Sequence, residues 1–284
     1  MIKKSLLILI SLFILLSCSN KVIAPLESEE VLIEKYGIDI SQKDIEIRNQ
    51  IEQKLKAYFQ EKGSYRVIFT GTPKEVYDNK ESGNQSLYVL TLEAASKLNI
   101  TMNIELDLKN INFQDGSIKA FMFSSYVDKY KNIVINFLFP ENKIRTIEKS
   151  AFNALCNTKE ITLPDSVIAI KEGAFTYSPS IERVTLGNGL QEIGALAFMG
   201  IDNLKEITIP DSVKSIGTQA FGYSPQLTTL TYLGTSPNNI NYEQDVFLLS
   251  TKLTTLIVPN AINEHDSTWK TFLGGKFTTV TKGL

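Results

Sequence analysis

Residues 207–221 read Ile-Thr-Ile-Pro-Asp-Ser-Val-Lys-Ser-Ile-Gly-Thr-Gln-Ala-Phe, and parts of this phrase return at a fixed interval along the chain. Ala-Phe also occurs at 151–152, 174–175 and 197–198, and Val-Phe follows at 246–247. The first four Phe residues are each 23 residues apart, and the last interval is 26. Residues 144–258 are therefore built from repeated units.

Each repeat carries two kinds of apolar pair. In the first kind the residues are spaced by two, as in Ile161/Leu163, Val184/Leu186, Ile207/Ile209, Leu230/Tyr232 and Leu256/Val258. This spacing is typical of the inward side of a β-strand. In the second kind they are spaced by three, as in Ile144/Ile147, Val167/Ile170, Leu190/Ile193 and Val213/Ile216.

A period of 23 residues is typical of leucine-rich-repeat solenoids, in which a unit buries its apolar face only by stacking on its neighbours. We therefore expect a solenoid, mostly β and irregular, with strands about 4.8 Å apart in one parallel sheet along the inner curve. The Phe residues are expected to stack behind that sheet as core. Trp269, Phe272 and Phe277 are expected to close the C-terminal end of this core.

The residues before the repeats predict a smaller α/β unit. Residues 41–62 form an amphipathic pattern, with a capping-box-like start at Ser41 and Asp44 and a stop at Gly63. This helix is expected to pack on its own domain; the alternative is that it lies on a membrane. Strands at 65–70 and 102–108 and a helix at 86–98 predict a parallel strand–helix–strand unit that covers the first rung.

The first residues are typical of an exported protein. Lys3 and Lys4 precede an apolar run from Ser5 to Ser17 that is too short for a typical membrane span. The run ends in Leu-Leu-Ser-Cys at 15–18, which resembles the bacterial lipobox, and this resemblance implies that Cys18 is acylated after cleavage. The alternative interpretation is a plain signal peptide with an incidental cysteine.

These features predict four segments. Residues 1–17 are a lipoprotein signal peptide, 18–40 the lipidated cysteine and a tether, 41–108 the α/β cap, and 109–284 the repeat domain with its C-terminal cap. Residues 29–36 within the tether are expected to form a short helix, and residues 109–143 to be imperfect repeats.

The residues that usually carry chemistry are sparse. The only His, His265, has charged neighbours and lies past the regular repeats, which favours a solvated side chain. Cys156 is expected to be a semi-buried thiol in a repeat turn, and no pair of cysteines has metal-ligand spacing. No phosphate loop or dinucleotide motif is present, and the net charge of −2 gives no reason to expect nucleic acid as a partner. The sequence therefore favours a non-enzymatic protein without metal or cofactor.

The exposed side of the predicted strands is the best candidate for binding a protein partner. Alternation points one column of side chains outward at Glu160, Arg183, Glu206, Thr229 and Thr255, and a second at Thr162, Thr185, Thr208, Thr231 and Ile257. Charges of opposite sign in the first column can pair across adjacent strands. The alternative is that Thr serves strand propensity and the charges serve solubility. Tyr177 and Tyr223 are either exposed aromatic anchors or stack on neighbouring repeats.

The phrases Ile-Gly-x-x-Ala-Phe at 193–198 and 216–221, with Ile-Thr-Ile-Pro-Asp-Ser-Val at 207–213, resemble the BspA-like leucine-rich repeats of spirochaete and oral-anaerobe surface proteins. The resemblance covers about residues 100–284. That family typically has a Cys three residues after the Phe, where this chain has Leu155, Ser178, Ile201, Ser224 and Ser250.

This resemblance implies a membrane-anchored lipoprotein, at the outer membrane or cell surface, that binds macromolecules, with adhesion to host proteins as the usual proposal. It carries over no ligand-binding residue. The alternative is an envelope scaffold that faces the periplasm. An enzyme hidden in the α/β unit is the weakest hypothesis, because that unit shows no polar constellation suited to catalysis.

Overall fold

The computed structural model describes residues 27–78, 85–125, 130 and 132–283. The chain divides into two compact units, Met1–Lys35 and Tyr36–Leu284. Helix α2 (Glu29–Tyr36) begins in the first unit, at the residues where the sequence predicts a short helix. The predicted signal peptide and Cys18 lie outside the described residues. Within the described ranges, no helix combines the length and the apolar character that crossing a membrane requires.

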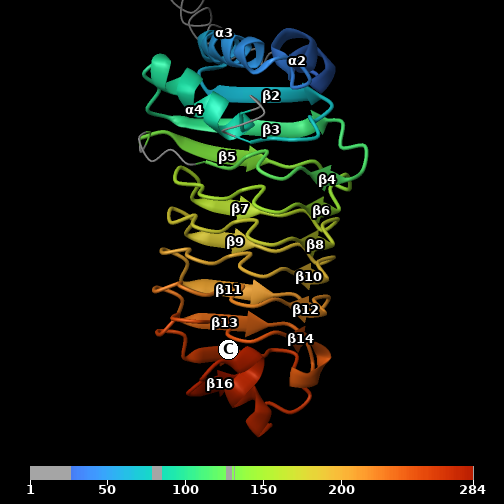
Figure 1. The fold of residues 1–284 in the computed structure, drawn as a ribbon, viewed down its shortest axis with the longest axis vertical. Helices are drawn as coiled ribbons and strands as arrows, with labels where there is room; N and C mark the ends of the chain where they lie inside the picture. The colour runs from blue at the N-terminus through green and yellow to red at the C-terminus, as the bar shows by residue number, and fades with distance from the viewer. Residues whose placement is uncertain (1–26, 79–84, 126–129, 131, 284) are drawn as a thin grey trace, which may run out of the picture. The chain divides into compact units, whose positions relative to one another are not determined.

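The second unit begins with a four-stranded parallel sheet in the order β1-β2-β3-β5, accompanied by two helices (Figure 1). Its elements are β1 (Gly37–Asp39), α3 (Asp44–Lys62), β2 (Tyr65–Gly71), α4 (Leu87–Lys97), β3 (Asn103–Ile111) and β5 (Val134–Leu138). The predicted strand–helix–strand unit is confirmed, because β2 and β3 pair in parallel and α4 connects them. Strand β5 then pairs with β3, which links this unit to the repeats.

Two local features of this unit differ from the expectation. Gly37–Asp39 falls among residues expected to be tether but forms β1 against β2, where Ile38 is fully buried. Helix α3 begins at Asp44 and is not capped by Ser41. The hydroxyl and the N–H of Ser41 donate to Asp39 Oδ1 at 2.7 and 2.9 Å, so this serine holds the preceding turn instead.

Each repeat contributes two strands, which stack in two columns (Figure 1). The column of longer strands contains β7 (Glu160–Thr162), β9 (Arg183–Thr185), β11 (Glu206–Ile209), β13 (Thr229–Tyr232), β15 (Thr255–Ile257) and β16 (Thr279–Thr281). The other column is a six-stranded parallel sheet of two-residue strands: β4 (Ser117–Ile118), β6 (Thr146–Ile147), β8 (Ala169–Ile170), β10 (Glu192–Ile193), β12 (Ser215–Ile216) and β14 (Asn241–Tyr242). This second sheet was not predicted, because apolar pairs spaced by three lack the alternation of a strand.

The predicted Phe spine is confirmed. The rings of Phe152, Phe175, Phe198 and Phe221 are fully buried and stack with centroids 5.0, 5.1 and 5.5 Å apart and interplanar angles of 2°. Phe247 follows the longer interval, is only half-buried, and is tilted by 22° to Phe221 at 6.0 Å. Equal repeat length therefore keeps the rings in register.

The column of longer strands is interrupted, whereas the sequence predicts one continuous sheet. Strand β7 pairs with β9, and β11 pairs with β13 and onward, but the described strands form no ladder between β5 and β7 or between β9 and β11. Strands β7 and β11 are the two described strands that form no ladder with the preceding strand of this column. Each follows a turn with an apolar residue three positions after the Phe, Leu155 before β7 and Ile201 before β11.

Serine in that slot can link successive turns. Ser178 Oγ accepts the N–H of Leu155 at 3.0 Å and donates to the carbonyl oxygen of Phe152 at 3.3 Å. Ser250 Oγ makes the same two hydrogen bonds, with Ser224 N at 3.0 Å and Phe221 O at 2.8 Å. An alkyl side chain such as Leu155 or Ile201 can form neither hydrogen bond. Ser224 Oγ bonds to Gly222 O of its own turn, and β11 and β13 still pair, so a serine in this slot accompanies the ladders but does not by itself set them.

The stack is closed at both ends by aromatic side chains. At the N-terminal end, the buried Tyr88 hydroxyl of α4 lies 3.2 Å from Thr158 Oγ1 and accepts the N–H of Asn157 at 3.2 Å. Burial raises the pKa of Tyr88 well above its usual range, which keeps the phenol protonated. At the C-terminal end, Trp269 and Phe272 in η2 (Ser267–Gly274) and Phe277 just after it are buried, as predicted.

We expect Phe198→Ala to destabilise the protein by about 3–5 kcal/mol, because it opens a cavity between two stacked rings. Phe247→Ala is the matched control at the half-buried end of the column, and its loss should be clearly smaller. Urea unfolding followed by circular dichroism measures both. Equal losses would contradict a spine that depends on stacking from both sides.

We expect Tyr88→Phe to cost about 1–3 kcal/mol, because it leaves the buried N–H of Asn157 without its acceptor. Tyr232→Phe is the matched control, since the Tyr232 hydroxyl is buried and has no hydrogen-bond partner among the described residues. Removing that hydroxyl should be neutral or slightly stabilising. Thermal unfolding of the two variants side by side tests the prediction, and similar melting temperatures would refute it.

Candidate functional site

The predicted partner-binding residues lie on one exposed surface, which we call the strand face. Along β7, β9 and β11, side chains alternate between exposed and buried positions, as predicted. Six of the predicted residues are exposed, and the seventh, Thr231 on β13, is half-buried. The strand face comprises Glu160, Thr162, Arg183, Thr185, Glu206, Thr208, Thr229 and Thr231.

Strand register divides this face into two halves. Glu160 lies opposite Arg183, and their side chains form an ion pair with Arg183 Nη1 2.9 Å from Glu160 Oε1. Glu206 lies opposite Thr229 in the next ladder, and no cation of the described chain lies within 4.0 Å of its carboxylate. Cross-strand charge pairing is therefore confirmed for the first two charges and wrong for Glu206, which is separated from Arg183 by the interruption between β9 and β11.

The polar groups of the strand face are available to a partner. The hydroxyls of Thr162, Thr185 and Thr208 make no hydrogen bond to another described side chain or backbone group, and each can both donate and accept. The exposed Glu160–Arg183 ion pair contributes little to folding, since such pairs are worth at most about 1 kcal/mol. The strand face is thus a polar surface whose side chains make few interactions within the fold.

The residues considered for chemistry do not converge. His265 is exposed, with Nε2 3.7 Å from Glu264 Oε1, and its neighbours make no nucleophile arrangement in the described structure. Cys156 is half-buried in a repeat turn, as expected. Within the described residues there is no cluster of three or more His, Cys, Asp or Glu side chains suited to a metal ion.

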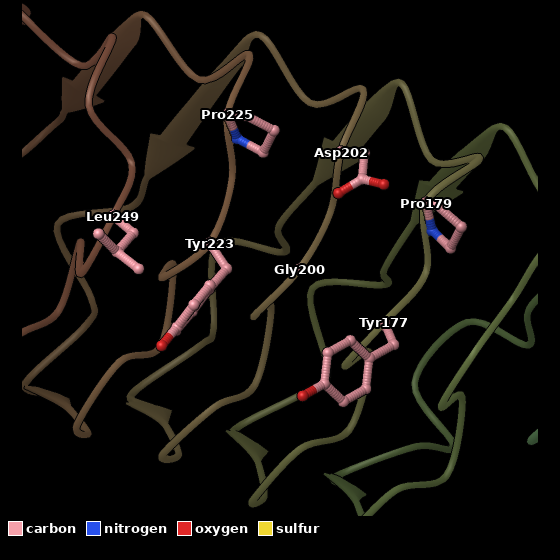
Figure 2. Close-up of a pocket in the computed structure, with 7 residues that line it drawn as sticks. All are labelled: Tyr177, Pro179, Gly200, Asp202, Tyr223, Pro225 and Leu249. Atoms are coloured by element: carbon pink, nitrogen blue, oxygen red, sulfur yellow. The ribbon is translucent and has the colours of Figure 1, made fainter.

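Sequence reasoning missed a hollow on the repeat turns, which we call the turn hollow. It has a volume of about 420 Å³ and is lined by Tyr177, Gly200, Asp202, Tyr223 and Leu249, with Pro179 and Pro225 at its sides (Figure 2). Tyr177 and Tyr223 are 59% and 43% exposed. Tyr177 also lies close against Gly200 of the next repeat, as expected for a tyrosine that packs on its neighbour, and its role as an anchor for a partner stays a prediction. The sequence did contain an indication of this hollow, because Tyr177 and Tyr223 recur at the same position of their repeats.

A second hollow, of about 320 Å³, lies over β10, β12 and β14 and is more polar. Its lining includes Glu192, Tyr242 and Glu243. The hydroxyl and the N–H of Thr218 donate to Glu243 Oε2 at 2.6 and 2.9 Å, and these hydrogen bonds lower the pKa of that carboxyl. Because Thr218 already donates two hydrogen bonds to this carboxylate, the second hollow has fewer polar groups without a partner than the strand face has.

Three solved structures resemble this chain at low sequence identity. Pneumococcal vaccine antigen PcpA is 15% identical, with a TM-score of 0.42, over 78% of this chain and 62% of that chain. A leucine-rich repeat protein from Bacteroides ovatus is 16% identical, with a TM-score of 0.34, over 68% and 63%. A leucine rich cell surface protein from Faecalibacterium prausnitzii is 10% identical, with a TM-score of 0.24, over 77% and 84%. The chain thus spans less than two thirds of the length of the first two.

The family comparison is more specific. A family model described as "BspA type Leucine rich repeat region" matches in six copies, over residues 116–242 and 145–269. No curated protein matches the chain. The matched residues make up more than half of the chain and coincide with the two columns of strands and the Phe spine. The chain therefore belongs to the BspA-type leucine-rich-repeat family.

Proposed function

We propose that this chain is a membrane-anchored surface lipoprotein whose strand face binds a protein partner, with adhesion to host proteins as the leading form of that role. The observation that carries the proposal is the strand face itself, with Arg183, Glu206 and the threonine hydroxyls on backbone held by strand ladders. A preorganised surface of this kind binds without a large cost for ordering its own residues. Membership of a family that suggests protein binding at the cell surface supports the proposal.

The proposal includes an arrangement of the whole chain. Residues 1–17 export it, acylated Cys18 and the residues up to 40 anchor and tether it, and residues 41–108 cap the repeats in 109–284. The boundary at 108 falls inside β3, which pairs with β5, so we expect cap and repeats to fold as one cooperative unit. No metal, cofactor or nucleic acid has a part in this proposal.

We expect Cys18→Ala, in the full chain made in a bacterium that processes lipoproteins, to move the protein from the membrane fraction to the soluble fraction. Each buried methylene of an acyl chain contributes about 0.8 kcal/mol to membrane anchoring, so losing the chains abolishes stable binding. Cys156→Ala is the matched control, because Cys156 lies in a repeat turn, and it should stay with the membrane. Mass spectrometry that finds no acyl group on wild-type Cys18 would refute the anchor.

We expect Arg183→Ala with Glu206→Ala to weaken binding to a captured partner about tenfold, which corresponds to about 1.4 kcal/mol. The matched control is Lys171→Ala with Glu192→Ala, which also removes one cation and one anion. It breaks an ion pair of 2.8 Å on the other column of strands. Biolayer interferometry on the protein captured from host-matrix or envelope extract measures both double variants. Equal effects would move the binding surface away from the strand face.

Protease treatment of intact cells separates surface adhesion from the periplasmic scaffold. A surface protein is digested on whole cells, whereas a scaffold that faces the periplasm is protected until the cells are lysed. Failure of the wild-type chain to capture any protein from either extract would overturn the binding role in both locations.

A further inference from the structure

The turn hollow is built from one slot of four successive repeat turns. This slot holds Tyr177, Gly200, Tyr223 and Leu249, at intervals of 23, 23 and 26 residues. Because Gly200 has no side chain, the turn between the two tyrosines contributes only backbone to the surface of the hollow (Figure 2). The ring of Tyr177 covers part of that backbone. A Cβ at Gly200 would lie 2.9 Å from Cδ1 of Tyr177, so any larger residue would displace that ring.

The large side chains in this slot are not required by the turn. Tyr177, Tyr223 and Leu249 have φ angles of 54°, 54° and 58°, in the left-handed region that bulky L-residues rarely adopt. Ala154 and Gly200 occupy the same slot with φ angles of 58° and 73°. The positive φ is thus common to this turn in every repeat, and alanine or glycine satisfies it. The turn geometry therefore gives no reason for a large aromatic side chain at 177 or 223.

Burial does not account for the tyrosines either. Tyr177, Tyr223 and Leu249 are 59%, 43% and 57% exposed, whereas the phenylalanines of the spine are fully buried. Within the described part of the chain, neither tyrosine ring stacks on another aromatic ring. Part of each ring is therefore open to solvent and to a ligand.

One unpaired charge lies at this hollow. Asp202 occupies the slot that holds Pro179 and Pro225 in the neighbouring repeats, and it lies between these prolines in Figure 2. Its carboxylate is exposed and has no cationic group within 4.0 Å among the residues that the structure describes. The hollow thus combines two aromatic rings, apolar walls and a single negative charge.

This combination selects for a particular ligand chemistry. A sugar would need several hydrogen-bond donors and acceptors, and the hollow offers few beyond one carboxylate and two phenols. A proline-rich segment would leave the carboxylate without a partner. An arginine side chain matches all three features, because its methylene stem is apolar and its planar cation both stacks on aromatic faces and donates to a carboxylate.

We propose that the turn hollow binds an arginine side chain presented by an extended segment of a protein partner. The guanidinium packs against the exposed parts of Tyr177 and Tyr223 and donates to Asp202, while its stem lies along the apolar wall of the hollow. This surface is separate from the strand face, and the proposal does not depend on that face binding anything.

The test uses the full chain in detergent, with ¹³C-labelled tyrosine rings observed by NMR. The probe is a seven-residue Gly/Ser peptide with one central arginine, and its control carries citrulline, the neutral analogue with the same shape. The arginine peptide should shift the Tyr177 and Tyr223 ring signals saturably, and the citrulline peptide should bind at least about fivefold more weakly. Equal binding of the two peptides would overturn the proposal.

Matched variants locate the effect. Asp202→Asn and Tyr223→Ala should each weaken the arginine peptide about fivefold. Alanine occurs in the tyrosine slot at Ala154, so Tyr223→Ala should keep the fold. Asp211→Asn and Tyr242→Ala replace exposed residues outside the hollow and should change nothing. Variants without effect at Asp202 and Tyr223, or a hexaproline peptide that binds as tightly as the arginine peptide, would refute the assignment.

Discussion

Stacking of each repeat on its neighbours is the interaction on which the rest of this structure depends. No rung has a complete core of its own, and the four stacked Phe rings are buried only because the turns above and below cover them. Stability in such a stack is approximately a sum of unit and interface contributions. A constant length of 23 residues is therefore a physical constraint. Where the interval lengthens to 26, η1 (Pro237–Asn239) takes up extra residues and Phe247 tilts out of parallel.

A stack of this kind has two open ends, and each would expose apolar side chains and an unpaired strand edge. At one end the β1-β2-β3-β5 sheet continues the parallel arrangement. Its buried Asp107 is paired with Arg66, which satisfies a charge that would otherwise be costly inside the cap. At the other end β16 pairs with β15, and Trp269 packs behind it with its indole N–H bonded to Asn263 O at 2.9 Å. At both ends, therefore, apolar side chains are buried, and Asp107 and the Trp269 indole among them have an ion-pair partner and a hydrogen-bond partner, respectively.

The register that aligns core positions also aligns exposed ones, so the two surfaces proposed for binding are columns of side chains too. On the strand face, equal spacing places Glu160 opposite Arg183 and Thr162 opposite Thr185. On the turns, the same rule aligns Tyr177, Gly200 and Tyr223, and the missing side chain of the glycine creates the hollow. Changes in such columns affect a ligand surface without disturbing the Phe spine, which is why one scaffold can present different chemistry on each side.

The sequence by itself determined the repeat length, the Phe spine, the inward strand residues and the exposed columns, because these follow from periodicity along one dimension. It also indicated the helices and parallel strands of the cap through their apolar patterns. Only the tertiary structure decided the second sheet, whose two-residue strands are too short to alternate, and the missing ladders between β5 and β7 and between β9 and β11. Only the tertiary structure also joined Asp202 to Tyr177 and Tyr223, since that hollow depends on which side chains of different rungs meet in space.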